Sequence, residues 1–336
     1  MMNGDHFRFK TEELELLYRI QYTAVAKEQV SGPSTSKLRS LLTSKQSQNS
    51  FENQNLLLKK QWLSEWSQAT ESLLGVNRNR TDLKSDIQTA FNHWSNAKKS
   101  AFIVEVATFV PYFSLSDEKQ SNKFSSIKFN PETLLSNAAE LLETNVDELY
   151  QISKSYTKTI KAIHKETSSN NTLLILSAAA AVSLLVAPYL AAGIGGLMGL
   201  SGAAATSAGL AMLGGGSLAT GGFGMAGGYV FTMGGGMLLS SGVNKITGHH
   251  KLANISGNEL IISAGKLAGF LEHYKRALFQ SEKEELLLST CTALRELQAS
   301  FEEKADTQFI MNESKSAKKT DEKAKLVAAT RRVIRR

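Results

Sequence analysis

The side chains that most often carry out covalent or metal chemistry are sparse in this sequence, and they lack the spacing that such chemistry needs. Cys291 is the only cysteine, so no disulfide forms within the chain, which fits a reducing compartment. The six histidines show no spacing typical of a metal site. No Ser/His/Asp, Cys/His or paired-carboxylate arrangement stands out. We therefore expect a protein that is not an enzyme, with no catalytic residue, metal or cofactor.

Lysines, in contrast, are regularly spaced on one side of the most unusual part of the chain. Four of them are 4, 3 and 4 residues apart and share one face of a helix: Lys154, Lys158, Lys161 and Lys165. Lys245 and Lys251 stand on the other side of that part. Basic residues beside an apolar segment favour the cytoplasmic side of a membrane. This pattern indicates contact with anionic lipid headgroups.

Between these two sets of lysines, the 78 residues from Thr167 to Asn244 include no Asp, Glu, Lys, Arg or His. Protein surfaces in water need charge, so this segment belongs in a bilayer or is folded away until it meets one. Leu173–Ala192 is apolar over 20 residues, which is about the number that spans the hydrocarbon core. A helix that is always buried in a soluble bundle is the alternative.

Small residues in the charge-free segment recur every four positions. The stretch from Gly193 to Gly242 holds 18 of the 25 glycines. A composition this rich in glycine produces some GxxxG pairs by chance, which is the alternative to a functional pattern. On a membrane helix, a ridge of small residues lets a second helix approach closely. Two ridges contain the glycines that we expect to pack helices together: Gly195, Gly199, Gly216, Gly224, Gly228 and Gly236. A phosphate-binding loop is disfavoured, because no Gly-Lys-Ser/Thr follows.

The two basic borders determine the expected membrane topology. Both should stay in the cytoplasm, which requires an even number of passes. The segment has room for at most about four passes of 20 residues, so two are expected, near 172–198 and 214–241, with four as the alternative.

The charged flanks are rich in helix formers, and we expect an all-α fold in which a charged helical bundle flanks a central Gly/Ala-rich transmembrane hairpin. The expected parts are an N-terminal helical domain (1–166), the hairpin (167–244), a C-terminal helical region (245–314) and a basic tail (315–336). Trp62, Trp66 and the apolar run 102–113 are expected in the core. Helices are predicted over 11–30, 36–47, 52–74, 82–109, 131–166 and 256–307, with a break near 280.

The tail, 315–336, has a net charge of +7, equal to that of the whole chain. Residues 311–320 are expected to fray, and the last sixteen to form a short basic helix. Its apolar face would hold Leu326, Val327, Thr330, Val333 and Ile334, beside Arg331, Arg332, Arg335 and Arg336. Such a helix can lie on an anionic leaflet. The alternatives are a disordered, solvated tail and contact with nucleic acid, which we do not expect as a partner of the chain as a whole.

An uncharged hairpin rich in Ala, Gly and Leu within a charged helical protein resembles bacterial α-helical pore-forming proteins of the colicin and cytolysin kind. The stretch LAMLGGGSLATGGFGMAGG at 210–228 also resembles glycine-rich hairpins of bacterial membrane proteins. The resemblance covers about a quarter of the chain and rests on pattern alone. It departs from secreted toxins because the N-terminus shows no secretion signal. It carries no catalytic residue across.

Together these patterns predict a membrane-active protein, made in the cytoplasm, with both termini on the cytoplasmic side of the bacterial inner membrane. The hairpin would insert in the lipid bilayer, self-associate through its glycine ridges and permeabilise the membrane, as a toxin, immunity or stress effector does. The alternative is a non-lytic, membrane-anchored scaffold that recruits a protein partner, such as one encoded by a neighbouring gene.

Overall fold

The computed structural model describes residues 9–30, 45–74, 82–112, 124, 126–167, 257–274 and 280–336, and every regular element in these ranges is an α-helix. The predicted all-α class is therefore confirmed for the described residues. None of their helices is long and apolar enough to cross a membrane. The predicted hairpin lies outside the described residues, together with its six glycines, Lys245 and Lys251.

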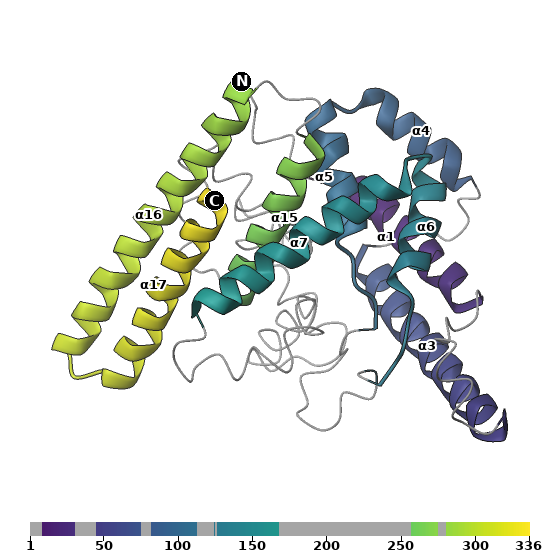
Figure 1. Ribbon diagram of the computed structural model, residues 1–336, viewed down its shortest axis with the longest axis horizontal. Helices are drawn as coiled ribbons and strands as arrows, with labels where there is room; N and C mark the ends of the chain where they lie inside the picture. Colours follow the sequence, from purple (N-terminus) through teal and green to yellow (C-terminus); the bar gives the residue numbers. More distant parts are fainter. Residues whose placement is uncertain are drawn as a thin grey trace.

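The helices fall into a group before the charge-free segment and a group after it (Figure 1). Those before it are α1 (Thr11–Val30), α3 (Lys45–Leu74), α4 (Leu83–His93), α5 (Asn96–Ala107), α6 (Pro131–Leu142) and α7 (Val146–Thr167). Those after it are α15 (Gly257–Tyr274), α16 (Gln280–Ile310) and α17 (Ser314–Arg335).

The boundaries of α1 match the prediction, and Glu12 and Glu13 lie in its first turn, where the helix dipole favours acids. Helix α3 begins at Lys45, seven residues before the predicted start at 52. The rest of the predicted helix 36–47 lies outside the described residues. The break predicted near 280 is confirmed, because α15 ends at Tyr274 and α16 begins at Gln280.

Two helices predicted to be continuous are each broken. The predicted helix 82–109 is divided at Trp94, because Ser95 has extended backbone angles and its hydroxyl accepts a hydrogen bond from the Lys98 amide (3.2 Å). The predicted helix 131–166 is divided after Glu143, which has left-handed backbone angles. Beyond it, the Asn145 side chain accepts a bond from the Asp147 amide (2.9 Å) and caps α7.

Aromatic side chains fill the core between α1, α3 and α5, as predicted. Trp62 and Trp66 are buried and stack with their ring centroids 5.2 Å apart. Phe102 is fully buried, and its ring centroid lies 5.0 Å from that of Trp94, across the break between α4 and α5. The apolar run that begins at Phe102 is buried through Phe109, which confirms its place in the core.

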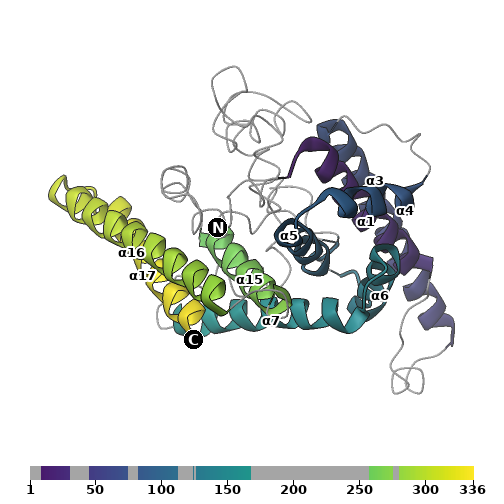
Figure 2. The ribbon, with the colours of Figure 1, turned by 90° about the horizontal axis from the view of Figure 1, so that it is seen from above.

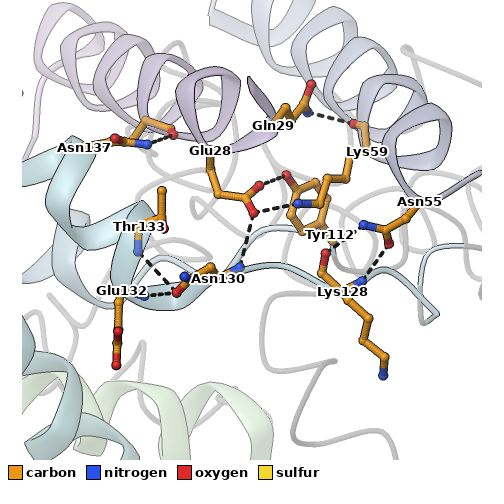
Figure 3. Close-up of polar contacts among 11 residues, drawn as sticks. Glu28, Gln29, Asn55, Lys59, Tyr112, Lys128, Asn130, Glu132, Thr133 and Asn137 are labelled. Carbon is orange, nitrogen blue, oxygen red and sulfur yellow. Dashed lines mark hydrogen bonds and ion pairs between the residues drawn. The ribbon is translucent and has the colours of Figure 1, made fainter. Parts of the chain in front are cut away.

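A buried acid connects α1 to α3 and to the chain that leads into α6 (Figure 3). The Glu28 carboxylate accepts bonds from Lys59 Nζ (2.6 Å), the Tyr112 hydroxyl (2.7 Å) and the Asn130 amide (3.2 Å). Burial and the Glu28 charge together raise the pKa of Tyr112, so its hydroxyl stays protonated and donates. Asn55 bonds both the amide and the carbonyl of Lys128 and holds the same segment on α3.

Helices α16 and α17 form an antiparallel hairpin that projects from the remaining helices (Figures 1 and 2). The turn between them places Asn312 in the left-handed region, at φ 61°. Beside the turn, the Thr320 hydroxyl donates to the Gln308 side chain (2.7 Å). The C-terminal end of α17 lies against α7, so the hairpin is attached to the body at one end.

Candidate functional site

The helices that border the charge-free segment, α7 and α15, pack against each other and run in opposite directions. A Cβ atom added at Gly265 would lie 2.7 Å from the Tyr156 ring, and one added at Gly269 would lie 3.0 Å from Ile152. One turn further along α15, His273 Nδ1 lies 2.9 Å from Glu148. As the numbers rise along α15, those of the α7 partners fall. Thr167 and Gly257, the described residues nearest to the segment on its two sides, therefore lie toward the same end of the pair.

The helices on the two sides of the segment share one hydrophobic core. Lys266 of α15 pairs with Glu105 of α5 at 2.5 Å, and both side chains are almost completely buried. Phe270 of α15 is fully buried. Tyr156 lies beside this pair, and its burial, helped by the Glu105 charge, raises the pKa of its hydroxyl. The chain thus leaves a folded body after α7 and rejoins the same body at α15.

The four lysines predicted to share a helix face do so on α7. All four are exposed: Lys154, Lys158, Lys161 and Lys165. The opposite face packs into the core through Leu149, Ile152, Tyr156, Ile160 and Ile163. The lysine face is therefore open to solvent along the helix that leads into the charge-free segment.

The tail is helical from Ser314 onward, so the predictions of fraying as far as residue 320 and of a disordered tail are wrong. Leu326, Val327 and Thr330 are buried, and Val333 and Ile334 are half-buried against the core. Protein thus covers the face that was predicted to meet lipid. An amphipathic helix buries its apolar face on whichever apolar surface is available, and α7, α15 and α16 supply it here.

The end of α17 is held to the end of α7 by one acid. The Glu166 carboxylate lies 2.8 Å from Arg332 Nε and 2.6 Å from an Arg336 guanidinium nitrogen. The hydrogen bond from Arg332 is the main reason that the pKa of Glu166 is lowered, and the charge of Arg336 adds to it. Because these contacts favour the ionised carboxylate, they stabilise the fold at neutral pH, and this stabilisation is lost as the pH falls through the lowered pKa of Glu166.

Basic side chains therefore gather where α7 ends. We call Lys161, Lys165, Arg332 and Arg336 the basic end; all four are exposed, and Glu166 lies among them. No protein-family model, curated protein or solved structure matches the chain. The geometry of the site is that of a positively charged surface at the point where an uncharged segment leaves the folded body.

The two remaining arginines of the tail, Arg331 and Arg335, lie near Cys291 of α16. Burial raises the pKa of the Cys291 thiol, although the charges of both arginines oppose this shift. A thiol with a raised pKa is a poor nucleophile, so this corner is no candidate for cysteine chemistry.

The rest of the described surface offers no competing site. Among the described residues, no group of three or more His, Cys, Asp or Glu side chains could hold a metal ion. A shallow, open depression between α1 and α6 is lined by Lys27 and Asn137, among others. Lys27 pairs with Glu140, and Asn137 bonds the Ala24 carbonyl, so both side chains bind the protein itself.

The residues that assemble the site were not predicted from the sequence. Glu166 is a lone acid at the end of the lysine face, and that position was the available signal for a partner in the basic tail. Gly265 and Gly269 have the same four-residue spacing as the glycines of the charge-free segment. That spacing predicts close helix approach in water as well as in lipid, and in α15 it marks the contact with α7.

Proposed function

We propose that this chain is a membrane-active protein whose helical body docks on an anionic bilayer and inserts the charge-free segment. One observation carries the proposal. The helices on either side of the segment, α7 and α15, are antiparallel, so Thr167 and Gly257 lie toward one side of the body, where the basic end lies. A body built in this way can remain folded on one side of a membrane while the segment enters it.

Insertion is favourable for the segment and need not disturb the body. With no charged side chain in 78 residues, the segment avoids the main cost of entering hydrocarbon. The contact between α7 and α15 depends on residues outside the segment, so the segment can leave without breaking that contact. Lys161 and Lys165 would each add about 1 kcal/mol of attraction to an anionic leaflet.

Self-association completes the proposed mechanism. Gly216, Gly224, Gly228 and Gly236 stand at four-residue intervals with Thr220 and Thr232, so an inserted helix would present a smooth ridge of small residues. Copies that pack along this ridge would surround or perturb a patch of lipid. The outcome is permeabilisation of the membrane, as in a toxin, immunity or stress effector.

Dye release from vesicles that contain anionic phospholipid tests this function. The unmodified chain should release dye, and the double variant Gly224→Leu/Gly228→Leu should release at least tenfold less, because two bulky side chains keep the helices apart. The control Gly222→Leu/Gly234→Leu adds the same two leucines away from the ridge and should still release dye.

Two results would contradict the proposal. If the ridge variant and the control release dye equally, packing through the glycine ridge is not the mechanism. If the unmodified chain binds the vesicles and releases no dye, the protein is the non-lytic, membrane-anchored scaffold instead.

A further inference from the structure

The turn of the α16–α17 hairpin exposes three consecutive large apolar side chains. Phe309, Ile310 and Met311 are 69%, 80% and 66% exposed. Single exposed apolar residues are ordinary, but three adjacent ones at a projecting turn form a patch that needs a partner. We call these three residues the apolar tip.

The backbone holds the apolar tip in a fixed, convex shape. The Met311 amide donates to the Thr307 carbonyl (3.1 Å) and the Asn312 amide to the Phe309 carbonyl (3.1 Å). The Glu313 amide donates to the Gln308 carbonyl (2.8 Å), which closes the end of α16. A convex point of this kind suits a fluid phase that closes around it, whereas a protein partner would need a matching pocket.

A positively charged surface runs from the apolar tip to the basic end. Along α17 the exposed side chains include Lys318, Lys325 and Arg332, seven residues apart and therefore on one face of the helix. Lys315 extends this face to the tip, and Arg336 extends it to the end of α7. We call these five residues the basic stripe. Asp321 pairs with Lys325 at 2.6 Å, and Glu166 pairs with Arg332 and Arg336, so these two acids offset part of the stripe's charge.

The basic stripe and the apolar tip together point to a lipid surface. Nucleic acid would use the stripe but would leave three apolar side chains in water. An anionic leaflet uses both, because its headgroups attract the stripe and its acyl boundary accepts the tip. In Figures 1 and 2, the hairpin projects toward the side on which α7 ends and away from α1 and α6.

We propose that the α16–α17 hairpin is a second membrane-binding element, which lays the basic stripe on anionic headgroups and inserts the apolar tip at the acyl boundary. The inference rests on the proposed function in placing the body at a membrane, but it involves no residue of the charge-free segment. The surface also differs from the one expected from the sequence, since the apolar face of α17 packs on protein and the basic stripe is the face exposed to solvent.

A fluorophore sensitive to polarity, attached to a single cysteine in the full chain, tests this placement. In a Cys291→Ala background, the label at Met311→Cys should shift its emission to the blue when anionic vesicles are added, and nitroxide lipids should quench it. The matched control is Leu288→Cys. Leu288 is 70% exposed on the same helix but about 33 Å from Ile310, so its label should stay in water.

A charge-introducing variant gives an independent measurement. Phe309→Glu/Ile310→Glu should lower the partition of the chain onto anionic vesicles about tenfold, because two large side chains lose their burial in lipid. Leu288→Glu should leave the partition unchanged. The circular dichroism spectra of these variants should match that of the unmodified chain, because Phe309, Ile310 and Leu288 are all exposed.

The other outcomes overturn the inference in distinguishable ways. If the chain binds vesicles while the label at Met311→Cys stays in water, the tip has no role and the proposed function stands. If the chain does not bind vesicles, both proposals fail. If the label responds to RNA or to rising protein concentration without vesicles, the hairpin binds nucleic acid or a second copy of the chain.

Discussion

Buried carboxylates set the packing of the helices at the scale of single residues. Glu28 and Glu105 each lie in the core opposite one lysine, and both pairs connect segments far apart in the sequence. A buried ion pair contributes little net stability, because desolvation offsets the attraction, but removing one partner leaves a charge with no counter-ion. Each pair therefore contributes more to the choice of which segments pack together than to the net stability of the fold.

Replacing Lys59 tests this role. Lys59→Met keeps the length and the apolar contacts of the side chain but removes the cation beside Glu28, and it should lower the free energy of unfolding by about 3–5 kcal/mol. Urea denaturation followed by circular dichroism measures the change. The neighbouring Lys60 is exposed, and Lys60→Met should change the same quantity by less than about 0.5 kcal/mol. A loss below about 1 kcal/mol in Lys59→Met would show that Tyr112 and Asn130 alone satisfy Glu28.

At the scale of the elements, the contact between α7 and α15 depends on a missing side chain. Gly265 faces the buried Tyr156 ring, so an added methyl group must displace that ring or Ile160. Gly265→Ala should therefore lower the unfolding free energy by about 1–2 kcal/mol through overpacking. At a helical site with open space around the glycine, the same change would raise the free energy of unfolding by up to about 1 kcal/mol. An unchanged or raised melting temperature would mean that the two helices are less closely packed than described.

The helix boundaries show how far sequence patterns determine the elements. The ends of α1 were predictable, because a long apolar period stops at Ser31-Gly32-Pro33. The breaks at Ser95 and Asn145 were not predicted, because the apolar period continues across both and hides the cap. Asn145 followed by Glu148 is a helix-start pattern, so that signal was present within the continuous period.

The candidate site was predictable only in part, for a different reason. The four lysines of α7 follow from spacing alone, because exposure on one helix face is a local property. The pairing of Glu166 with Arg332 joins residues on opposite sides of the charge-free segment. Such a contact depends on how α17 packs in three dimensions, and the position of Glu166 beside the lysine face indicates that it needs a basic partner without indicating which one.

At the scale of the whole molecule, the antiparallel arrangement of α7 and α15 makes a prediction about membrane topology. Single cysteines at Asn170→Cys and Asn254→Cys, in a Cys291→Ala background, should react with a membrane-impermeant maleimide from the same side of the bilayer. Ala205→Cys, in the predicted link between two passes, should react only from the opposite side. Inverted and right-side-out membrane vesicles distinguish these cases. Labelling of Asn170→Cys and Asn254→Cys from opposite sides would require an odd number of passes.

The shared core also governs the order of events during synthesis. Glu105 is made long before Lys266, and the ribosome must complete the uncharged stretch between them before the two can meet. At about 5–20 residues per second, that delay is on the order of ten seconds. Within that time the whole charge-free segment is synthesised, before Lys266 can complete the buried pair. Any factor that binds the charge-free segment during synthesis would therefore meet it before α15, α16 and α17 exist.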